Sequence, residues 1–69
     1  MTFGEAIIKL RSERRISQRQ LAEELNVSFT SVNRWENGKT MPNKMTVFVI
    51  RKYCEAHGLD FSYDEGVRA

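Results

Sequence analysis

Apolar residues at helical spacing mark the first element of the chain. Phe3, Ile7 and Leu10 lie three or four positions apart and therefore share one face of a helix. Thr2 and Glu5 form the capping-box pattern just before this stripe, in which a hydroxyl and a carboxylate satisfy free backbone N–H groups at a helix start. The pattern predicts a helix that begins after Thr2 and buries one narrow stripe.

Two shorter helices are predicted next, one after the other. Ser17 and Gln20 repeat the capping-box pattern, and Asn26 tolerates the left-handed conformation that ends helices. Ser28 is a favoured cap for the following helix, and Gly38 suits its end. The apolar face of the first of these helices consists of Leu21, Ala22 and Leu25, and that of the second consists of Val32 and Trp35. About three residues separate the two helices, which is typical of a helix-turn-helix.

A fourth helix is predicted with Asn43 or Thr46 as its cap. Residues 45–50 are rich in β-branched and apolar side chains, which would also suit a strand. Helical spacing continues beyond them, however, and Gly58 makes a suitable stop, so a helix is favoured. The positions that continue the helical spacing are Val47, Ile50, Cys54 and His57.

The residues after the fourth helix predict either a short fifth helix around Phe61 and Tyr63 or an acidic tail, within residues 59–69. No repeat, low-complexity segment or linker interrupts the chain, and 69 residues make one domain at most. The expectation is therefore a single all-α domain that spans residues 1–69.

Composition argues against several classes of protein. One cysteine and one histidine are too few for an internal disulfide or for the roughly four ligands of a structural zinc site. They also leave no catalytic constellation, so no enzyme activity, cofactor or metal is expected. No apolar run approaches the roughly 20 residues of a membrane span, and the N-terminus lacks the form of a signal peptide. A reduced, cytoplasmic setting is the natural expectation.

The net charge of +2 is unevenly distributed along the chain. Three acidic residues against one arginine give residues 59–69 a net charge of −2, which leaves +4 on the first 58 residues. A mildly basic body with an acidic tail suits an anionic partner, although solvated surface charge explains the pattern nearly as well.

The polar face of the third helix carries the candidate chemistry. At about 100° per residue, the side chains that point away from the apolar pair are Thr30, Asn33, Arg34 and Asn37, with Phe29 at the edge. Arg34 can donate two hydrogen bonds to guanine, and Asn33 can pair with adenine. Thr30 and Phe29 can contact a thymine methyl group. Any exposed helix face is polar, but the two caps and the tight turn favour a helix that reads a DNA groove.

Contacts to the DNA backbone are expected at helix starts and in the flanking turns. The start of the second helix has free N–H groups that suit a phosphate. Gln18 would either add an amide hydrogen bond to that phosphate or brace the third helix. The cations expected to contact phosphates are Arg19, Lys39 and Lys44, although solubility alone explains each of them about as well.

An ion pair is expected between the first and third helices. Arg11 lies at the border of the first apolar stripe, and Glu36 lies at the border of the buried face of the third helix. A partly buried pair would lock the reading helix to the scaffold, whereas two independent surface charges would not.

The segment from Leu10 to Pro42 resembles the Cro and lambda-repressor-like (Xre) family of helix-turn-helix DNA-binding proteins. The motifs that carry the resemblance are Ser17-Gln18, Leu21-Ala22, Val27-Ser28, Ser31-Val32, Trp35-Glu36-Asn37-Gly38 and Pro42. The resemblance implies a lambda-repressor-like bundle of four or five helices. It also implies a bacterial or phage-type transcriptional regulator, often a repressor, that binds a near-palindromic operator in double-stranded DNA as a dimer.

The resemblance also implies roles for particular residues. It assigns phosphate contacts to Gln18 and Asn37, base contacts to Thr30, Asn33 and Arg34, and the ion pair to Arg11 and Glu36. The full set of expected phosphate contacts is Gln18, Arg19, Ser28, Asn37, Lys39 and Lys44.

Two positions depart from the family pattern. Phe29 stands where related repressors often carry a polar base reader, so it either touches a thymine methyl group or is tucked inward. Arg15 occupies a helix-ending position where the family often has glycine or asparagine, which suggests strain or a different turn.

The fourth helix is apolar almost all round. One face consists of Val47, Ile50, Tyr53 and Cys54, and a second consists of Met45, Val49 and Ala56 with Phe48 nearby. One small core cannot bury both faces. The surplus predicts either a homodimer through the fourth helix and tail or an extended core covered by Phe61 and Tyr63.

Sequence-specific DNA binding for transcription control is the leading functional prediction. The alternative is an antitoxin-like or controller protein that binds a protein partner and regulates its own operon. A long partner-binding tail would favour the alternative, and only about ten residues follow the fourth helix.

Overall fold

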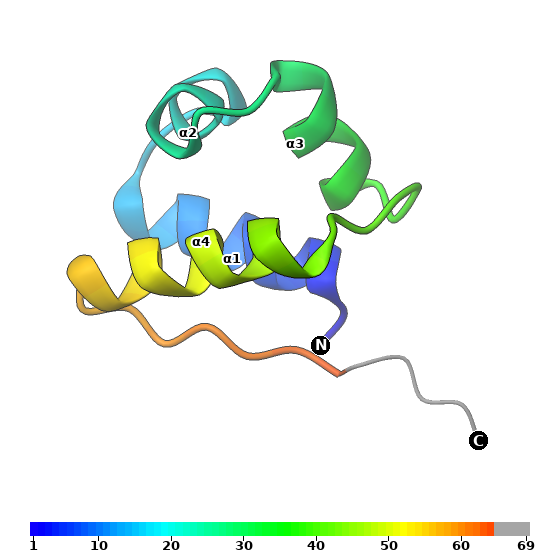
Figure 1. Ribbon diagram of the computed structural model, residues 1–69. Helices are drawn as coiled ribbons and strands as arrows, with labels where there is room; N and C mark the ends of the chain where they lie inside the picture. The colour runs from blue at the N-terminus through cyan, green and yellow to red at the C-terminus, as the bar shows by residue number, and fades with distance from the viewer. Residues whose placement is uncertain (65–69) are drawn as a thin grey trace.

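Four α-helices joined by short turns make up the fold (Figure 1). The computed structural model describes residues 1–64. The helices are α1 (Phe3–Arg14), α2 (Gln18–Leu25), α3 (Phe29–Glu36) and α4 (Lys44–Ala56). Helices α2 and α3 form one layer, and α1 and α4 lie below them in Figure 1. No strand occurs within residues 1–64, and the predicted all-α class and helix order are confirmed.

Each helix begins at a residue whose side chain accepts a backbone hydrogen bond. Thr2 and Glu5 form the full capping box, with bonds of 3.1 and 2.9 Å. Ser17 caps α2, but the Gln20 amide bonds to Glu24 instead, so the second capping box is only half formed. The other caps are Ser28 for α3 and Asn43, not Thr46, for α4.

The buried stripes of the four helices meet in one core. Ile7, Leu21, Val32 and Ile50 have no exposed surface, and each comes from a different helix. The stripes predicted for the first three helices are all buried. Cys54 is buried with them, and burial raises the pKa of its thiol to about 11. It is therefore a small core residue and stays protonated at neutral pH.

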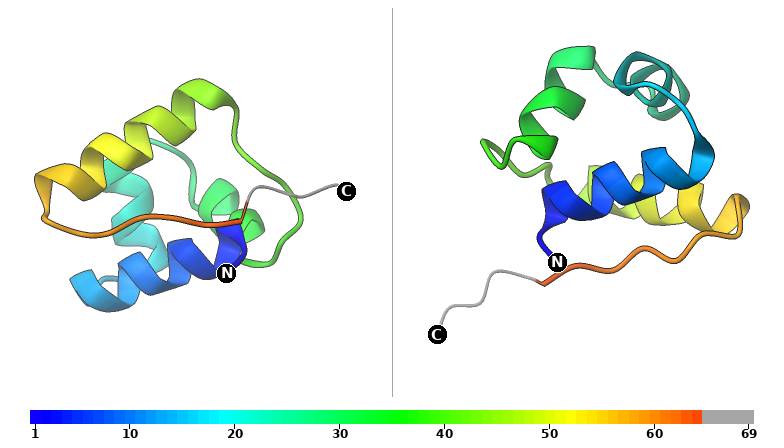
Figure 2. Two further views of the ribbon diagram at one scale, coloured as in Figure 1. Left: turned by 90° about the horizontal axis from the view of Figure 1, so that it is seen from below. Right: turned by 180° about the vertical axis from the view of Figure 1, so that it is seen from behind.

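The tail after α4 is extended, so the expected fifth helix is absent from residues 59–64. The part of that expectation that concerns residues 65–69 lies outside the described residues. Figure 2 shows the tail running back along the side of α1 and α4 that is opposite α2 and α3. Phe61 and Tyr63 both pack edge-on against Phe3, with ring centroids 6.0 and 5.1 Å away. Two residues at i and i+2 share a face only in an extended chain, which explains why no helix forms here.

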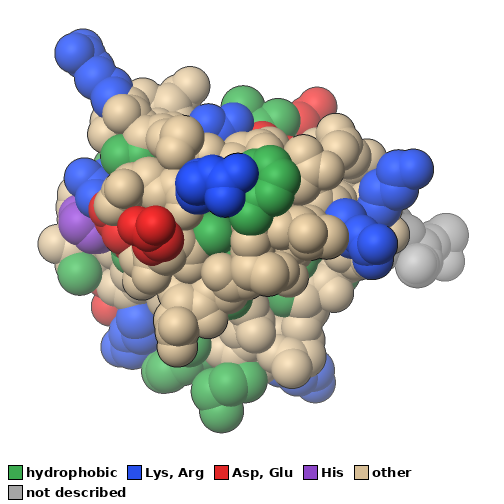
Figure 3. Space-filling model, turned by 90° about the horizontal axis from the view of Figure 1, so that it is seen from above, with side chains coloured by type: hydrophobic (Ala, Val, Ile, Leu, Met, Phe, Trp, Pro, Cys, Tyr) green, Lys and Arg blue, Asp and Glu red, His purple; other side chains and the backbone are tan. Residues whose placement is uncertain are grey.

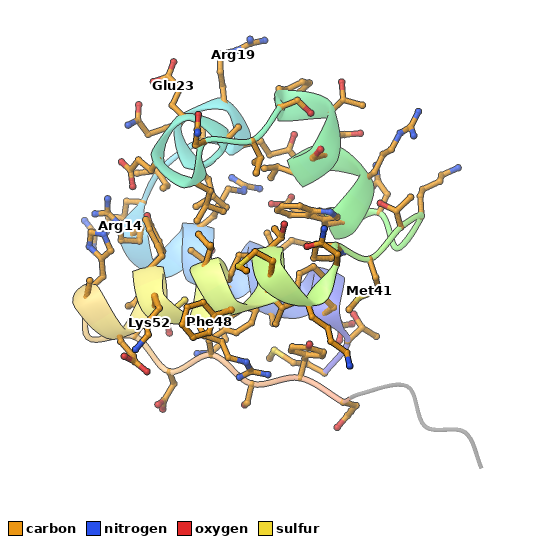
Figure 4. The ribbon with its side chains drawn as sticks, viewed as in Figure 1. Arg14, Arg19, Glu23, Met41, Phe48 and Lys52 are labelled. Carbon is orange, nitrogen blue, oxygen red and sulfur yellow. The ribbon has the colours of Figure 1, made fainter. Side chains whose placement is uncertain are left out.

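A polar contact between Arg14, Glu24 and Tyr53 ties α1, α2 and α4 together (Figure 4 labels Arg14). The Arg14 guanidinium donates to Glu24 at 2.7 Å and to the Tyr53 hydroxyl at 2.9 Å. Hydrogen bonds from the Tyr53 hydroxyl, the Gln20 amide and Arg14 lower the pKa of Glu24 to about 2. This carboxylate therefore stays charged at neutral pH and keeps its three partners in place.

Arg15 ends α1 in the left-handed conformation, with φ 57° and ψ 46°. Asn26 ends α2 in the same region, as predicted, but asparagine tolerates that region better than arginine does. The departure seen at Arg15 in the sequence is therefore a strained turn. Its backbone N–H still closes the helix by bonding to the Ser12 carbonyl at 3.2 Å.

We predict that Arg15→Gly stabilises the domain by about 0.5–1 kcal/mol. Glycine removes the cost of a side chain in the left-handed region, and this gain exceeds the added entropy of the unfolded chain. Thermal denaturation followed by circular dichroism measures the effect. Arg15→Ala is the control, because it removes the charge but keeps the strained Cβ atom. A melting temperature for Arg15→Gly no higher than that for Arg15→Ala would contradict the prediction.

Candidate nucleic-acid interface

The turn between α2 and α3 makes the two helices one compact pair. Asn26 turns the chain through its left-handed conformation, and the Val27 N–H donates to the Ala22 carbonyl at 2.9 Å. Ser28 then starts α3 by accepting a hydrogen bond from the Ser31 N–H. The resulting layer forms the upper side of the molecule in Figure 1 and the face seen in Figure 3.

Helix α3 turns a polar side to solvent because its apolar side is fully anchored. Val32 and Trp35 are 0% and 4% exposed and belong to the core. Thr30 and Arg34, one helical turn apart, are both exposed, as is Asn37 at the end of the helix. The orientation required of a reading helix is therefore present.

The pair expected between Arg11 and Glu36 is formed. The Arg11 Nε and Nη2 atoms donate to the two carboxylate oxygens of Glu36 at 2.6 and 2.9 Å. The Glu36 side chain is only 6% exposed, whereas that of Arg11 is 23% exposed. Arg11 also donates to the Ile16 carbonyl, so it connects α1, the following turn and the end of α3.

Gln18 braces α3, which is one of the two roles expected for it. Its Nε2 atom donates to Glu36 at 2.7 Å, and its Oε1 atom accepts from the Asn33 amide at 3.3 Å. Asn33 accepts in turn from Asn37 at 3.2 Å. A continuous polar network therefore runs from Arg11 on α1 through α3 and α2 to the exposed end of α3.

This network changes what Gln18 and Asn33 can offer to DNA. Both ends of each amide already have protein partners, and both side chains are half-buried. Asn33 would have to leave Gln18 and Asn37 before it could pair with an adenine edge. A phosphate at the start of α2 would meet the backbone N–H groups there rather than the Gln18 amide.

Gly4 holds the end of α3 against α1, a contact that the sequence pattern did not indicate. A Cβ atom at this position would lie 2.5 Å from the Trp35 carbonyl oxygen and 3.0 Å from that of Glu36. Only glycine permits this close approach of two backbones. The available signal was an isolated glycine inside an otherwise regular helical pattern, which often has a packing reason.

Several cations are free on or beside the same layer. Arg19, Arg34, Lys39 and Lys44 are exposed and make no ion pair within residues 1–64, unlike Arg11 and Arg14. Lys and Arg side chains stand out at several points of the face in Figure 3, and Arg19 projects from α2 away from α1 and α4 in Figure 4. These charges remain available to an anionic partner.

Phe29 is exposed, not tucked inward, at 40% of its surface. The guanidinium carbon of Arg19 lies 4.9 Å from the centroid of its ring. Ser28 is occupied by its capping role and shares a 2.9 Å hydrogen bond with the Ser31 hydroxyl. The stacking of Arg19 on Phe29 was not expected from the sequence.

Comparison with known proteins identifies the family to which this arrangement of helices belongs. The family profile described as Helix-turn-helix matches residues 7–63. The chain belongs to the helix-turn-helix family. It is 42% identical over 53 residues to the HTH-type transcriptional activator BcrR of Enterococcus faecalis, and 36% identical over 55 residues to the HTH-type transcriptional regulator DicA of Escherichia coli (strain K12).

The two relatives are longer than this chain. The matched segments cover 77% and 80% of this chain but only 26% of BcrR and 41% of DicA. No solved structure matches the chain. Among the helices of residues 1–64, none has the length and apolar character needed to cross a membrane.

We predict that Glu36→Gln lowers the free energy of unfolding by about 3 kcal/mol. The substitution leaves the Arg11 guanidinium without a counter-charge in a partly buried position. Urea denaturation followed by the fluorescence of Trp35, the single tryptophan, measures the loss. Glu13→Gln breaks the exposed pair with Lys9 and should cost only about 0.5 kcal/mol. Equal losses of unfolding free energy in the two variants would show that the Arg11–Glu36 pair stabilises the domain no more than an exposed pair does.

Proposed function

We propose that this helix-turn-helix domain binds double-stranded DNA with α3 in the major groove and acts in transcription control. The observation that carries the proposal is the exposed pair Thr30 and Arg34 on a helix whose opposite side is fixed by Trp35 and Glu36. A rigid helix with free side chains can place donors against base edges reproducibly. Family membership and the names of both relatives support the same function.

The proposed division of roles follows exposure and free hydrogen-bond donors. Arg34 reads guanine and Thr30 contacts a thymine methyl group, because both side chains are exposed on α3. Asn33 reads adenine only after it exchanges its protein partners, so its contribution is the smaller one. The contacts to the DNA backbone come from three cations, Arg19, Lys39 and Lys44, and from the free backbone N–H groups at Gln18 in the first turn of α2. Ser28 and Asn37, at the two ends of α3, are smaller contributors because their side chains already have protein partners.

A homodimer on a near-palindromic operator is part of the proposal. Four apolar side chains on or beside α4 are 41–69% exposed: Met41, Met45, Phe48 and Val49. The tail extends the core, as the other expectation had it, because Phe61 and Tyr63 pack on Phe3 and contact Arg51, but it leaves these four side chains exposed. Figure 4 places Phe48 on α4, away from Arg19 and from the layer formed by α2 and α3. A two-fold contact there would set the two reading helices about 34 Å apart, one turn of DNA.

We propose that the protein represses transcription by occupying the operator. The relative named as an activator shows that the same kind of domain also occurs in activators. In both relatives the matched segment is less than half of the protein, so the domain works there with further polypeptide.

We predict that Arg34→Ala and Lys39→Ala weaken operator binding in different ways. Selection from random duplex DNA first supplies the operator. Arg34→Ala should relax the preference at one base pair, since a bidentate contact discriminates by about 1–3 kcal/mol. Lys39→Ala should weaken binding evenly across sequences and flatten the salt dependence. Gel-shift titrations at several salt concentrations measure both effects, and the same sequence-independent loss in both variants would contradict the proposed roles.

We predict that Phe48→Glu separates the dimer while the domain stays folded. A carboxylate in an apolar two-fold contact is both desolvated and placed opposite its own copy. Sedimentation of the protein–operator complex should show two chains for the wild type, and the variant should need at least tenfold more protein to fill the operator. Ile8→Glu is the control, because Ile8 is a similarly exposed apolar residue on α1. Unchanged stoichiometry and affinity for Phe48→Glu would rule out a dimer contact at α4.

A further inference from the structure

Arg19 and Phe29 form a stacked pair across the helix-turn-helix. Arg19 is the second residue of α2, and Phe29 is the first residue of α3. The guanidinium carbon lies 4.9 Å from the ring centroid, within the range of a cation–π contact. Both side chains are exposed, and Figure 4 shows Arg19 directed away from α1 and α4. The pair therefore lies on the layer that would meet DNA.

The contact with Arg19 accounts for an aromatic residue at the exposed position 29. Phe29 is 40% exposed and belongs neither to the core cluster nor to the partly buried residues packed against it. Its ring instead supports a long side chain that has four freely rotating bonds when it is unsupported. Holding such a side chain before binding reduces the entropy lost when it contacts a partner.

Arg19 differs from the other arginines that contact aromatic rings. Arg14 also donates to Glu24 and to the Tyr53 hydroxyl, and Arg51 donates to the Phe61 carbonyl. Arg19 makes no hydrogen bond or ion pair with another side chain within residues 1–64. The N–H donors of Arg19 therefore stay free for an anionic oxygen, while the ring of Phe29 lies beside the guanidinium.

We infer that Phe29 is a positioning residue that holds the Arg19 guanidinium against a phosphate of the operator, and that it does not read a thymine methyl group. The inference rests on the proposed DNA-binding function. A phosphate is the target because Arg19 belongs to the first helix of the motif, which crosses the DNA backbone while α3 enters the groove. Phe29 then acts through Arg19, and its own contact with bases is dispensable.

A double-mutant cycle tests whether the two residues act together. The dissociation constant for the selected operator is measured by fluorescence anisotropy for the wild type, Arg19→Ala, Phe29→Ala and the double variant. Phe29→Ala should weaken binding about two- to fivefold. The double variant should bind as Arg19→Ala does, with no further loss. Arg19→Ala should also reduce the slope of log affinity against log salt by about 0.9, the value for one phosphate contact.

Two substitutions at position 29 distinguish the effect of an aromatic ring from the effect of apolar volume. Phe29→Tyr keeps an aromatic face and should retain wild-type affinity, whereas Phe29→Leu keeps apolar volume and should bind as weakly as Phe29→Ala. Lys9→Ala is the control for the loss of one positive charge, since Lys9 lies on α1 beside the tail and not on the layer of α2 and α3. Its affinity should stay within twofold of the wild type. Because Arg19 and Phe29 are exposed, the variants at these two positions should remain folded at the temperature of the binding assay. Lys9→Ala also loses the exposed pair with Glu13 and should melt only slightly lower than the wild type.

Operators with deoxyuridine in place of each thymine test the alternative role of Phe29. If Phe29 reads a methyl group, one such replacement will weaken the wild type but not Phe29→Ala, and the inference fails. It also fails if the losses of the two single variants add, or if Phe29→Leu binds as well as Phe29→Tyr. Wild-type protein that binds no duplex DNA would overturn the proposed function and this inference together. Wild-type binding with additive losses would overturn this inference alone.

Discussion

The position of α3 depends on the nearly buried carboxylate of Glu36. It accepts hydrogen bonds from the Arg11 guanidinium and from the Gln18 amide, so it needs α1 and α2 at the same time. A buried carboxylate without partners is costly, and the end of α3 can therefore be buried only when both neighbours are in place. The two helices of the motif are therefore both joined to α1 through this one carboxylate.

Local signals made much of the fold predictable. The caps at Thr2, Ser17 and Ser28 and the stripes of apolar residues depend on a few neighbouring positions, and the structure confirms them. The end of α1 at Arg15 was noticed through the family resemblance, which suggested strain or a different turn, and Arg15 lies in the left-handed region. Of the two forms expected for the tail, the short helix is absent from residues 59–64, because local patterning alone did not decide between a helical turn and an extended tail. Its packing on Phe3, which comes from the other end of the chain, decides between them.

The residues of the candidate site could be predicted from the sequence, but their hydrogen-bond partners could not. Side chains that face outward from α3 follow from helical geometry, and Thr30 and Arg34 are exposed as expected. The partners of the Gln18 and Asn33 amides could not be foreseen, because they depend on the separation of α2 and α3 to within an ångström. The same is true of the Arg19 stack on Phe29. Carboxylates hold Arg11 and Arg14, whereas Arg19 and Arg34 make no ion pair within residues 1–64. A net charge of only +2 therefore still leaves uncompensated cations on the layer of α2 and α3.

The contact at Gly4 has a consequence for how this domain can diversify. With the backbone of α1 directly beneath the last turn of α3, no side chain can be inserted between them to raise or tilt the helix. Exchanges at positions 30 and 34 therefore alter which groups are presented but not the height or angle at which they are presented. New binding preferences can arise from a few surface substitutions, with the frame beneath them left as it is.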